Sequence, residues 1–339
     1  MGDERTFFSS RPIVTIAGQR RQEIGDELLS LLVEETIDGL FRCEMKISNW
    51  GLKDGNMDFL FFDRSVIEFG AELSVELGPP GRSRKVFAGK ITAIEGEFPA
   101  ARPPEITVLA EDQLQDLRMT RRTRCYDEMS DEDVVSQVAS AHGLSPQVDC
   151  SGPTYKVLTQ VNQSDLAFLR DRARAADALL RVEDGAIHFQ ARANANEGTI
   201  QLAYGRELRE FTVLADLAHQ RSSVKATGWD VSSKEAVSGE GSASAVSGEL
   251  GNLTGGGSIL SQKFADRVDQ LAHLVPFTDG EAKALAEARY REIARRFVTG
   301  SAHAEGDGRL RVGAEAEFSG LGDLFDGKYA IVGVRHTFD

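Results

Sequence analysis

The sequence predicts an α+β fold that is mostly β, in which two related small β-barrels flank an α+β middle domain. Three observations support this fold class. Apolar and polar residues alternate with a period of two near both ends of the chain, as in strands with one buried face. A short motif occurs twice. The middle of the chain carries helix-capping signals instead. A length of 339 residues is enough for two or three domains.

The repeated motif opens with Gly-Ala-Glu and closes with Phe-x-Gly-Lys. It occupies residues 70–90 and again residues 313–328, with a shorter spacer in the second copy. Two copies are too few for a solenoid, so the repeat predicts two related β-domains in one chain. The alternative is chance similarity between two glycine-containing hairpins. The residues that define the repeat are Gly70, Phe87, Gly89 and Lys90 in the first copy and Gly313, Phe325, Gly327 and Lys328 in the second.

Residues 1–115 are predicted to form the first β-barrel. Cys43, Met45 and Ile47 alternate with polar neighbours, and a Gly-Pro-Pro-Gly sequence at 78–81 predicts a turn between two further strands. Several short strands separated by glycine and proline are typical of a small barrel or sandwich.

Residues 116–210 are predicted to form the α+β middle domain. Ser130 precedes an acidic first turn and an apolar helical face, and Gly143 follows as a stop signal. A second helix is predicted from Ser164. Asp184-Gly185 between two alternating segments predicts a tight hairpin, because this turn needs positive φ at both central positions.

Residues 211–339 are predicted to form the second β-barrel, with an insertion at about 233–298. The segment from 232 to 258 is rich in Gly, Ser and Ala, which predicts a mobile loop. We expect residues 232–262 to be disordered in the isolated subunit. The sequence Thr-Asp-Gly-Glu at 278–281 predicts a capped helix of about 18 residues that ends at Thr299-Gly300.

Charge and composition exclude several classes of partner. The formal net charge is −14, which argues against binding to nucleic acid or to an anionic membrane surface. No apolar run reaches the roughly 18 residues that a membrane-spanning helix needs, and the N-terminal residues have no secretory signal pattern. The three cysteines are widely spaced, which indicates reduced thiols in a cytoplasmic setting.

A search for catalytic motifs predicts no active site. The sequence has no phosphate-binding loop, no dinucleotide fingerprint, no zinc motif and no nucleophile elbow. No two of the six histidines have the spacing of metal ligands on a helix. We therefore predict no catalytic, cofactor-binding or metal-binding residue, and a protein that is not an enzyme.

Three stretches in order along the chain resemble the phage late control D family. They are residues 105–144, with a strand, an Arg-rich run and a capped helix; residues 163–190, with a helix and a small hairpin; and residues 320–339, with a Gly…Phe-x-Gly-x-Tyr…His-x-Phe ending. Together with the strand at 12–18, the resemblance covers nearly the whole chain. This family supplies the baseplate hub of contractile tails, and its fold also forms the N-terminal part of the valine-glycine-repeat spike proteins of type VI secretion.

The resemblance implies a structural protein with tube-like barrels. Hub proteins of this family are trimers, so two barrels per chain imply a pseudo-six-fold ring that joins a hexameric inner tube to a trimeric spike. The implied partners are the inner tail tube protein, a separate spike protein and other baseplate proteins. A separate spike is expected because the sequence ends at Asp339 without a needle. The implied location is a phage tail or tail-like particle assembled in the bacterial cytoplasm.

Two other functions remain open at this point. The chain could be a cell-wall hydrolase of a tail tip, which requires a cleft with two carboxylates or a metal site. It could instead be a monomeric protein-binding module in which paired β-domains hold a partner. The sequence does not identify interface residues for any of the three functions.

Overall fold

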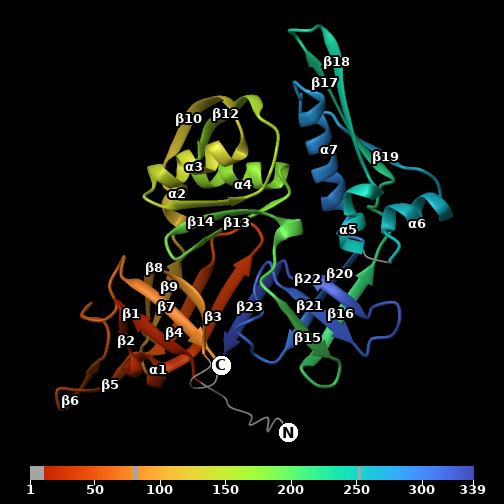
Figure 1. The fold of residues 1–339 in the computed structure, drawn as a ribbon. Helices are drawn as coiled ribbons and strands as arrows, with labels where there is room; N and C mark the ends of the chain where they lie inside the picture. Colours follow the sequence, from red (N-terminus) through yellow and green to blue (C-terminus); the bar gives the residue numbers. More distant parts are fainter. Residues whose placement is uncertain (1–10, 79–82, 251–252) are drawn as a thin grey trace.

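The computed structural model describes residues 11–78, 83–250 and 253–339 (Figure 1). The chain is mostly β, with 46% strand and 21% helix, which confirms the predicted fold class. We distinguish four units by their elements: an N-terminal barrel (β1–β4 and β7–β9), a middle unit (β10–β14 and α2–α4), a C-terminal barrel (β15, β16 and β20–β22) and an arm (β17–β19 and α5–α7).

The N-terminal barrel is a curled sheet with strand order β2-β1-β7-β8-β9-β4-β3-β23. Alternate side chains of one strand fill its core, because Cys43, Met45 and Ile47 are fully buried, as the alternation predicted. Its elements are β1 (Ile13–Ile16), β2 (Gln19–Arg20), α1 (Gln22–Glu27), β3 (Leu28–Thr36), β4 (Arg42–Ser48), β7 (Glu72–Leu77), β8 (Arg84–Glu97) and β9 (Glu105–Glu111). A separate hairpin, β5 (Trp50–Lys53) and β6 (Asn56–Phe59), projects from it. The turn predicted at 78–81 includes residues outside the described ones.

The last strand of the chain, β23 (Gly333–Phe338), lies in the sheet of the N-terminal barrel. It pairs antiparallel with β3 from Gly333 opposite Thr36 to Phe338 opposite Leu31, and the Ile37 N–H donates to the Val332 carbonyl at 3.0 Å. The C-terminal end of the sequence therefore contributes a strand to the N-terminal barrel.

The middle unit packs three helices between a long two-stranded ladder and a three-stranded sheet. The predicted caps are confirmed: the Ser130 and Ser164 side chains each accept a backbone N–H from the first turn of a helix. The predicted hairpin turn is also confirmed, with positive φ at Asp184 and Gly185. The elements are α2 (Gln115–Arg118), β10 (Arg121–Met129), α3 (Asp131–Ala141), β11 (Ser145–Asp149), β12 (Tyr155–Ser164), α4 (Asp165–Ala175), β13 (Ala178–Glu183) and β14 (Ala186–Ala191).

The C-terminal barrel consists of two small sheets around one core. Phe211 and Phe318 stack in this core with ring centroids 4.5 Å apart. After η1 (Arg192–Asn194), its strands are β15 (Thr199–Ala203), β16 (Leu208–Ala215), β20 (Val298–Ala304), β21 (Glu315–Ser319) and β22 (Gly327–Ala330). Strand β16 spans the boundary that we predicted between residues 210 and 211. The domain boundaries themselves stay a prediction.

The arm is inserted between β16 and β20 and extends beside the middle unit (Figure 1). The prediction of a loop at 232–258 is wrong, because the described residues of this segment form a strand and short helices. The arm elements are β17 (Ser223–Asp230), β18 (Glu235–Ser242), η2 (Ala243–Val246), α5 (Ser247–Leu250), α6 (Gly256–Lys263), β19 (Val268–Leu271) and α7 (Asp279–Ala294). Disorder of 232–262 in the isolated subunit stays a prediction, and residues 251–252 lie outside the described ones.

The small residues of β18 serve close packing. A Cβ atom added to Gly239 would lie 2.2 Å from the Lys283 backbone nitrogen, and one added to Gly241 would lie 2.4 Å from the Ala286 carbonyl oxygen. The backbone of β18 thus approaches α7 as only glycine permits. The predicted helix cap at Thr278 is confirmed. The predicted end of that helix is wrong: α7 ends at Ala294, and Thr299-Gly300 lies in β20, where it pairs with β16.

Candidate interaction surfaces

The two Gly-Ala-Glu segments adopt the same local structure. In the first copy, the Gly70 N–H donates to the Ile91 carbonyl at 2.8 Å, and the Ile91 N–H donates to the Ala71 carbonyl at 3.0 Å. In the second copy, the same two bonds join Gly313 and Ala314 to Ile331, at 3.2 and 2.9 Å. Both glycines have positive φ. Ile91 and Ile331 are therefore equivalent positions, and β21 is the counterpart of β7.

The Phe-x-Gly-Lys halves of the motif are not equivalent. Lys90 lies directly before Ile91 and opposite Glu72, whereas Lys328 lies three positions before Ile331 and opposite Glu317. Relative to the isoleucine that bonds the Gly-Ala-Glu segment, Phe-x-Gly-Lys thus lies two positions earlier in the second copy than in the first.

The remaining motif residues differ accordingly. Phe87 is buried in the core of the N-terminal barrel, while Phe325 lies in a turn where its N–H donates to the Gly322 carbonyl. Gly89 faces the backbone of Glu111 in β9 so closely that a Cβ atom would lie 2.2 Å from its carbonyl oxygen. A Cβ atom added to Gly327 would meet no atom within 4 Å, but this glycine has a φ of 144°. The glycine of the motif is therefore required for close packing in the first copy and for its backbone conformation in the second.

One arginine connects the two barrels and the middle unit. The Arg311 guanidinium lies 3.4 Å from Glu35 of β3 and 3.1 Å from Glu183 of β13. The Glu35 carboxylate, only 1% exposed, also accepts the Val312 N–H at 3.1 Å. Burial raises the pKa of Glu35, so Arg311 supplies the positive charge that this carboxylate needs when ionised. Sequence reasoning missed this contact, because its partners are far apart in the chain.

A second ion-pair cluster fixes the arm to the middle unit. Arg295 at the end of α7 forms two hydrogen bonds with Asp177, one of them 2.8 Å long, and its Nε donates to Glu249 of α5 at 2.8 Å. Asp177 is 8% exposed. Removal of either partner would leave a poorly hydrated charge, so the orientation of the arm depends on this contact.

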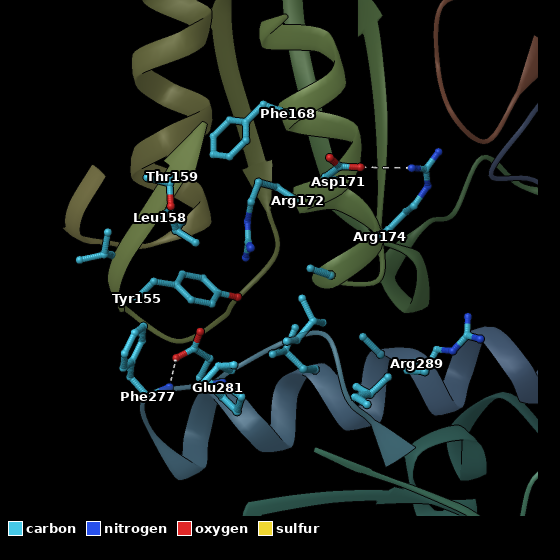
Figure 2. Close-up of a pocket in the computed structure, with 18 of the residues that line it drawn as sticks. Tyr155, Leu158, Thr159, Phe168, Asp171, Arg172, Arg174, Phe277, Glu281 and Arg289 are labelled. Atoms are coloured by element: carbon cyan, nitrogen blue, oxygen red, sulfur yellow. Dashed lines mark hydrogen bonds and ion pairs between the residues drawn. The ribbon is translucent and has the colours of Figure 1, made fainter. Parts of the chain in front are cut away.

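A groove of about 550 Å³ separates the middle unit from the arm (Figure 2). Its walls are formed by β12 and α4 on one side and by α7 with residues 271–277 on the other. The apolar part of the lining includes Leu158, Phe168, Leu274, Val275, Phe277 and Leu285.

Charged side chains of the groove have hydrogen-bond partners on the protein. Arg172 holds the Asp131 carboxylate through two bonds of 2.6 and 3.0 Å and lies 4.3 Å above the Tyr155 ring. Asp171 accepts a hydrogen bond from Arg174, as Figure 2 shows, and Glu281 accepts the Phe277 N–H. Glu292, the remaining carboxylate of the lining, accepts hydrogen bonds from Arg289 and Arg296.

Two further buried carboxylates have structural partners. Asp112 accepts the N–H groups of Phe41 and Leu114 at 2.8 and 2.9 Å, and burial raises its pKa to about 7. Asp165 accepts a hydrogen bond from Gln160 at 2.9 Å and lies 2.9 Å from His142 Nε2. Within residues 11–78, 83–250 and 253–339, no group of three or more His, Cys, Asp or Glu side chains could hold a metal ion. None of the helices in these ranges is long and apolar enough to cross a membrane.

The β5–β6 hairpin presents an exposed apolar surface. Trp50, Phe59, Phe62 and Phe98 form a chain of ring contacts with centroids 5.2 to 5.9 Å apart. Leu52 and Met57 on the same hairpin are also exposed. A two-stranded hairpin is only marginally stable by itself, so this surface is a candidate contact for a partner protein.

The fold of the whole chain is that of known tail proteins. The 43 kDa tail protein of prophage MuSo2 from Shewanella oneidensis superposes with a TM-score of 0.67 at 11% identity, covering 97% of this chain and 95% of that one. The tail protein from Neisseria meningitidis MC58 gives 0.65 at 11% identity, covering 97% and 92%. An Escherichia coli type VI secretion component, described as similar to the T4 tail proteins gp27 and gp5, gives 0.55 at 13% identity, covering 92% and 70%.

These likenesses place the chain in the fold class of phage tail and type VI secretion proteins, and so confirm the predicted resemblance at the level of fold. Residues 13–339 match the family described as Alg8 N-terminal domain, and the chain belongs to this family. No curated protein matches the sequence.

Proposed function

We propose that this protein is a structural baseplate hub of a contractile tail or injection system. In this function three copies form a ring in which six barrels alternate, so that the ring meets a hexameric inner tube on one side and a trimeric spike on the other. A six-to-three adaptor needs two like surfaces in each chain, because identical contacts repeat only at the true symmetry. Its other partners are further baseplate proteins, and assembly takes place in the bacterial cytoplasm.

The observation that carries the proposal is the repeated hydrogen-bond pattern around Ile91 and Ile331, within a fold shared with tail proteins over nearly the whole chain. The pattern supplies the pair of like barrel hairpins that the adaptor requires. The type VI secretion neighbour extends the same fold to a second kind of injection machine.

The two alternative functions receive less support. A hydrolase needs an acid and a base or nucleophile on either side of the bond to be cleaved. The carboxylates described in the groove are held by an arginine or a backbone N–H, which suits a structural role. A monomeric binding module needs no repeated barrel hairpin.

The proposal is tested by native mass spectrometry of the full chain, alone and with the inner tube and spike proteins of the same tail. We expect a homotrimer that binds both partners, and rings of six similar lobes in negative-stain images. A strict monomer in the presence of both partners would overturn the proposed function. Release of soluble fragments from purified peptidoglycan would favour the hydrolase instead.

A further inference from the structure

The C-terminal barrel contains a strand pair with two open edges. Strands β16 and β20 pair with each other from Leu208 opposite Ala304 to Ala215 opposite Val298. In the described part of the chain neither strand belongs to a larger sheet, and the only additional bridge joins Leu208 to Tyr204. Strand edges with free N–H and C=O groups readily pair with another chain.

The equivalent strand pair in the N-terminal barrel has both edges covered. Strands β3 and β4 precede the first Gly-Ala-Glu hairpin, as β16 and β20 precede the second, and both pairs are antiparallel. Strand β9 covers the free edge of β4, and β23 covers the free edge of β3. Strand β16 is thus the counterpart of β3, but its outer edge has no covering strand within the described residues.

The cover on β3 comes from the other barrel. Strand β23 continues from β22 of the C-terminal barrel and forms six residue pairs with β3. A strand added across a barrel boundary is therefore one of the contacts by which this chain joins its two barrels. In the proposed ring of alternating barrels, the uncovered edge of β16 is available for a contact of the same kind with the next chain.

We propose that the outer edge of β16 is an interface between copies of this chain, and that it receives a strand from the N-terminal barrel of the neighbouring copy. The inference rests on the proposed ring and names the surface that closes it. Each copy carries a net charge of −14, so copies repel at long range. Hydrogen bonds between backbone groups do not depend on net charge. They can therefore hold two acidic copies together at this edge.

The backbone geometry identifies the groups that would bond across this interface. The Asp216 N–H donates to the Phe297 carbonyl at 2.9 Å, toward β20. Because successive residues of a strand direct their backbone groups to opposite edges, the N–H groups of Phe211, Val213 and Ala215 face the outer edge of β16. By the same alternation, the N–H of Ala302 faces the outer edge of β20.

Two exposed alanines on the same strand pair give a matched test. Ala215→Pro removes an outward N–H of β16, and Ala302→Pro removes an outward N–H of β20, and neither substitution breaks a bond between the two strands. Native mass spectrometry of the full chain over a concentration series measures association. Hydrogen exchange of residues 208–215 measures protection, and thermal unfolding checks that both variants fold.

We expect the unmodified chain to form trimers with slowed exchange at Phe211, Val213 and Ala215. Ala215→Pro should weaken association by about tenfold, as expected for one lost interfacial hydrogen bond, whereas Ala302→Pro should leave it unchanged. Trimers that Ala215→Pro leaves intact, or that show no protection at 208–215, would overturn this interface and leave the proposed hub function standing. An unmodified chain that stays monomeric with tube and spike proteins would overturn both.

Discussion

Strand β8 of the N-terminal barrel and the consecutive strands β22 and β23 at the end of the chain begin alike and end differently. Each hydrogen-bonds a Gly-Ala-Glu segment through an isoleucine, Ile91 or Ile331. Each is then irregular: the register of β8 shifts between Ile91 and Ala93, and residues 331–332 separate β22 from β23. Beyond this point β8 pairs with β9 of its own barrel, whereas β23 pairs with β3 of the other barrel.

This difference shows how one local structure can close a barrel or join two barrels. The residues around the glycine determine the local hairpin structure. The strand that is available as a neighbour determines which barrel the following strand pairs with. Like hairpins therefore need not occupy like environments. Four predictions test this comparison, from the largest expected effect to the smallest.

The joint between the barrels should depend most strongly on Arg311. In Arg311→Ala the buried Glu35 loses its positive partner, and we expect the free energy of unfolding to fall by about 3–5 kcal/mol. Denaturant unfolding measures this change. Arg335→Ala is the matched control, because Arg335 pairs with Glu34, the neighbour of Glu35 on β3, but is exposed. This variant should lose less than about 1 kcal/mol. If both variants lost the same free energy of unfolding, Arg311 would contribute no more to the contact between the barrels than an exposed ion pair.

The two motif glycines should respond differently to the same substitution. Gly89→Ala forces a Cβ atom against the Glu111 backbone, and overpacking of this kind costs about 3 kcal/mol. Gly327→Ala meets no neighbour and should cost about 1 kcal/mol through its positive φ alone. Thermal and denaturant unfolding of both variants measure the difference. If Gly327→Ala were the more damaging change, the assigned environments of the two hairpins would be wrong.

The arm should be sensitive to the small residues of β18. Gly241→Ala places a Cβ atom against the backbone of α7, and we expect a loss of about 2 kcal/mol together with faster proteolysis of the arm. Gly248→Ala in α5 serves as the control, since a Cβ atom there meets nothing within 4 Å. Unchanged proteolysis in Gly241→Ala would mean that the hairpin and α7 are not closely packed.

The stability of the protein should also depend on pH through Asp112, which follows β9. Its pKa of about 7 is raised by burial, so the folded state binds a proton more tightly than the unfolded state. This contribution to stability is complete below the unfolded pKa of about 4 and is lost as the pH rises through 7. In Asp112→Asn, stability should therefore increase more, or decrease less, than in the unmodified chain between pH 4.5 and 7.5. Parallel stability curves for the two proteins would exclude this role for Asp112.

Elements fixed by local interactions were predictable from the sequence. The caps at Ser130 and Ser164 and the Asp184-Gly185 turn act within a few residues, so their patterns are visible in the chain. The Gly-Ala-Glu half of the repeated motif also has the same structure in both copies, because the glycine conformation and its hydrogen bonds are local.

Long-range contacts could not be predicted in this way. Nothing near Arg311 marks Glu35 as its partner, and no pattern in residues 333–338 shows that they pair with β3. The composition of β18 was ambiguous for a different reason: glycine and small polar residues suit a flexible loop and also a strand pressed against a helix. The partner helix, α7, lies about 40 positions further along the chain.

The insertion point of the arm has a consequence for evolution. Ala215 and Val298 face each other across the ladder, so the segment between them leaves and re-enters the barrel at neighbouring positions. The barrel strands on either side do not depend on the length of what they enclose. A longer, shorter or differently shaped insertion at this point is therefore compatible with the same barrel.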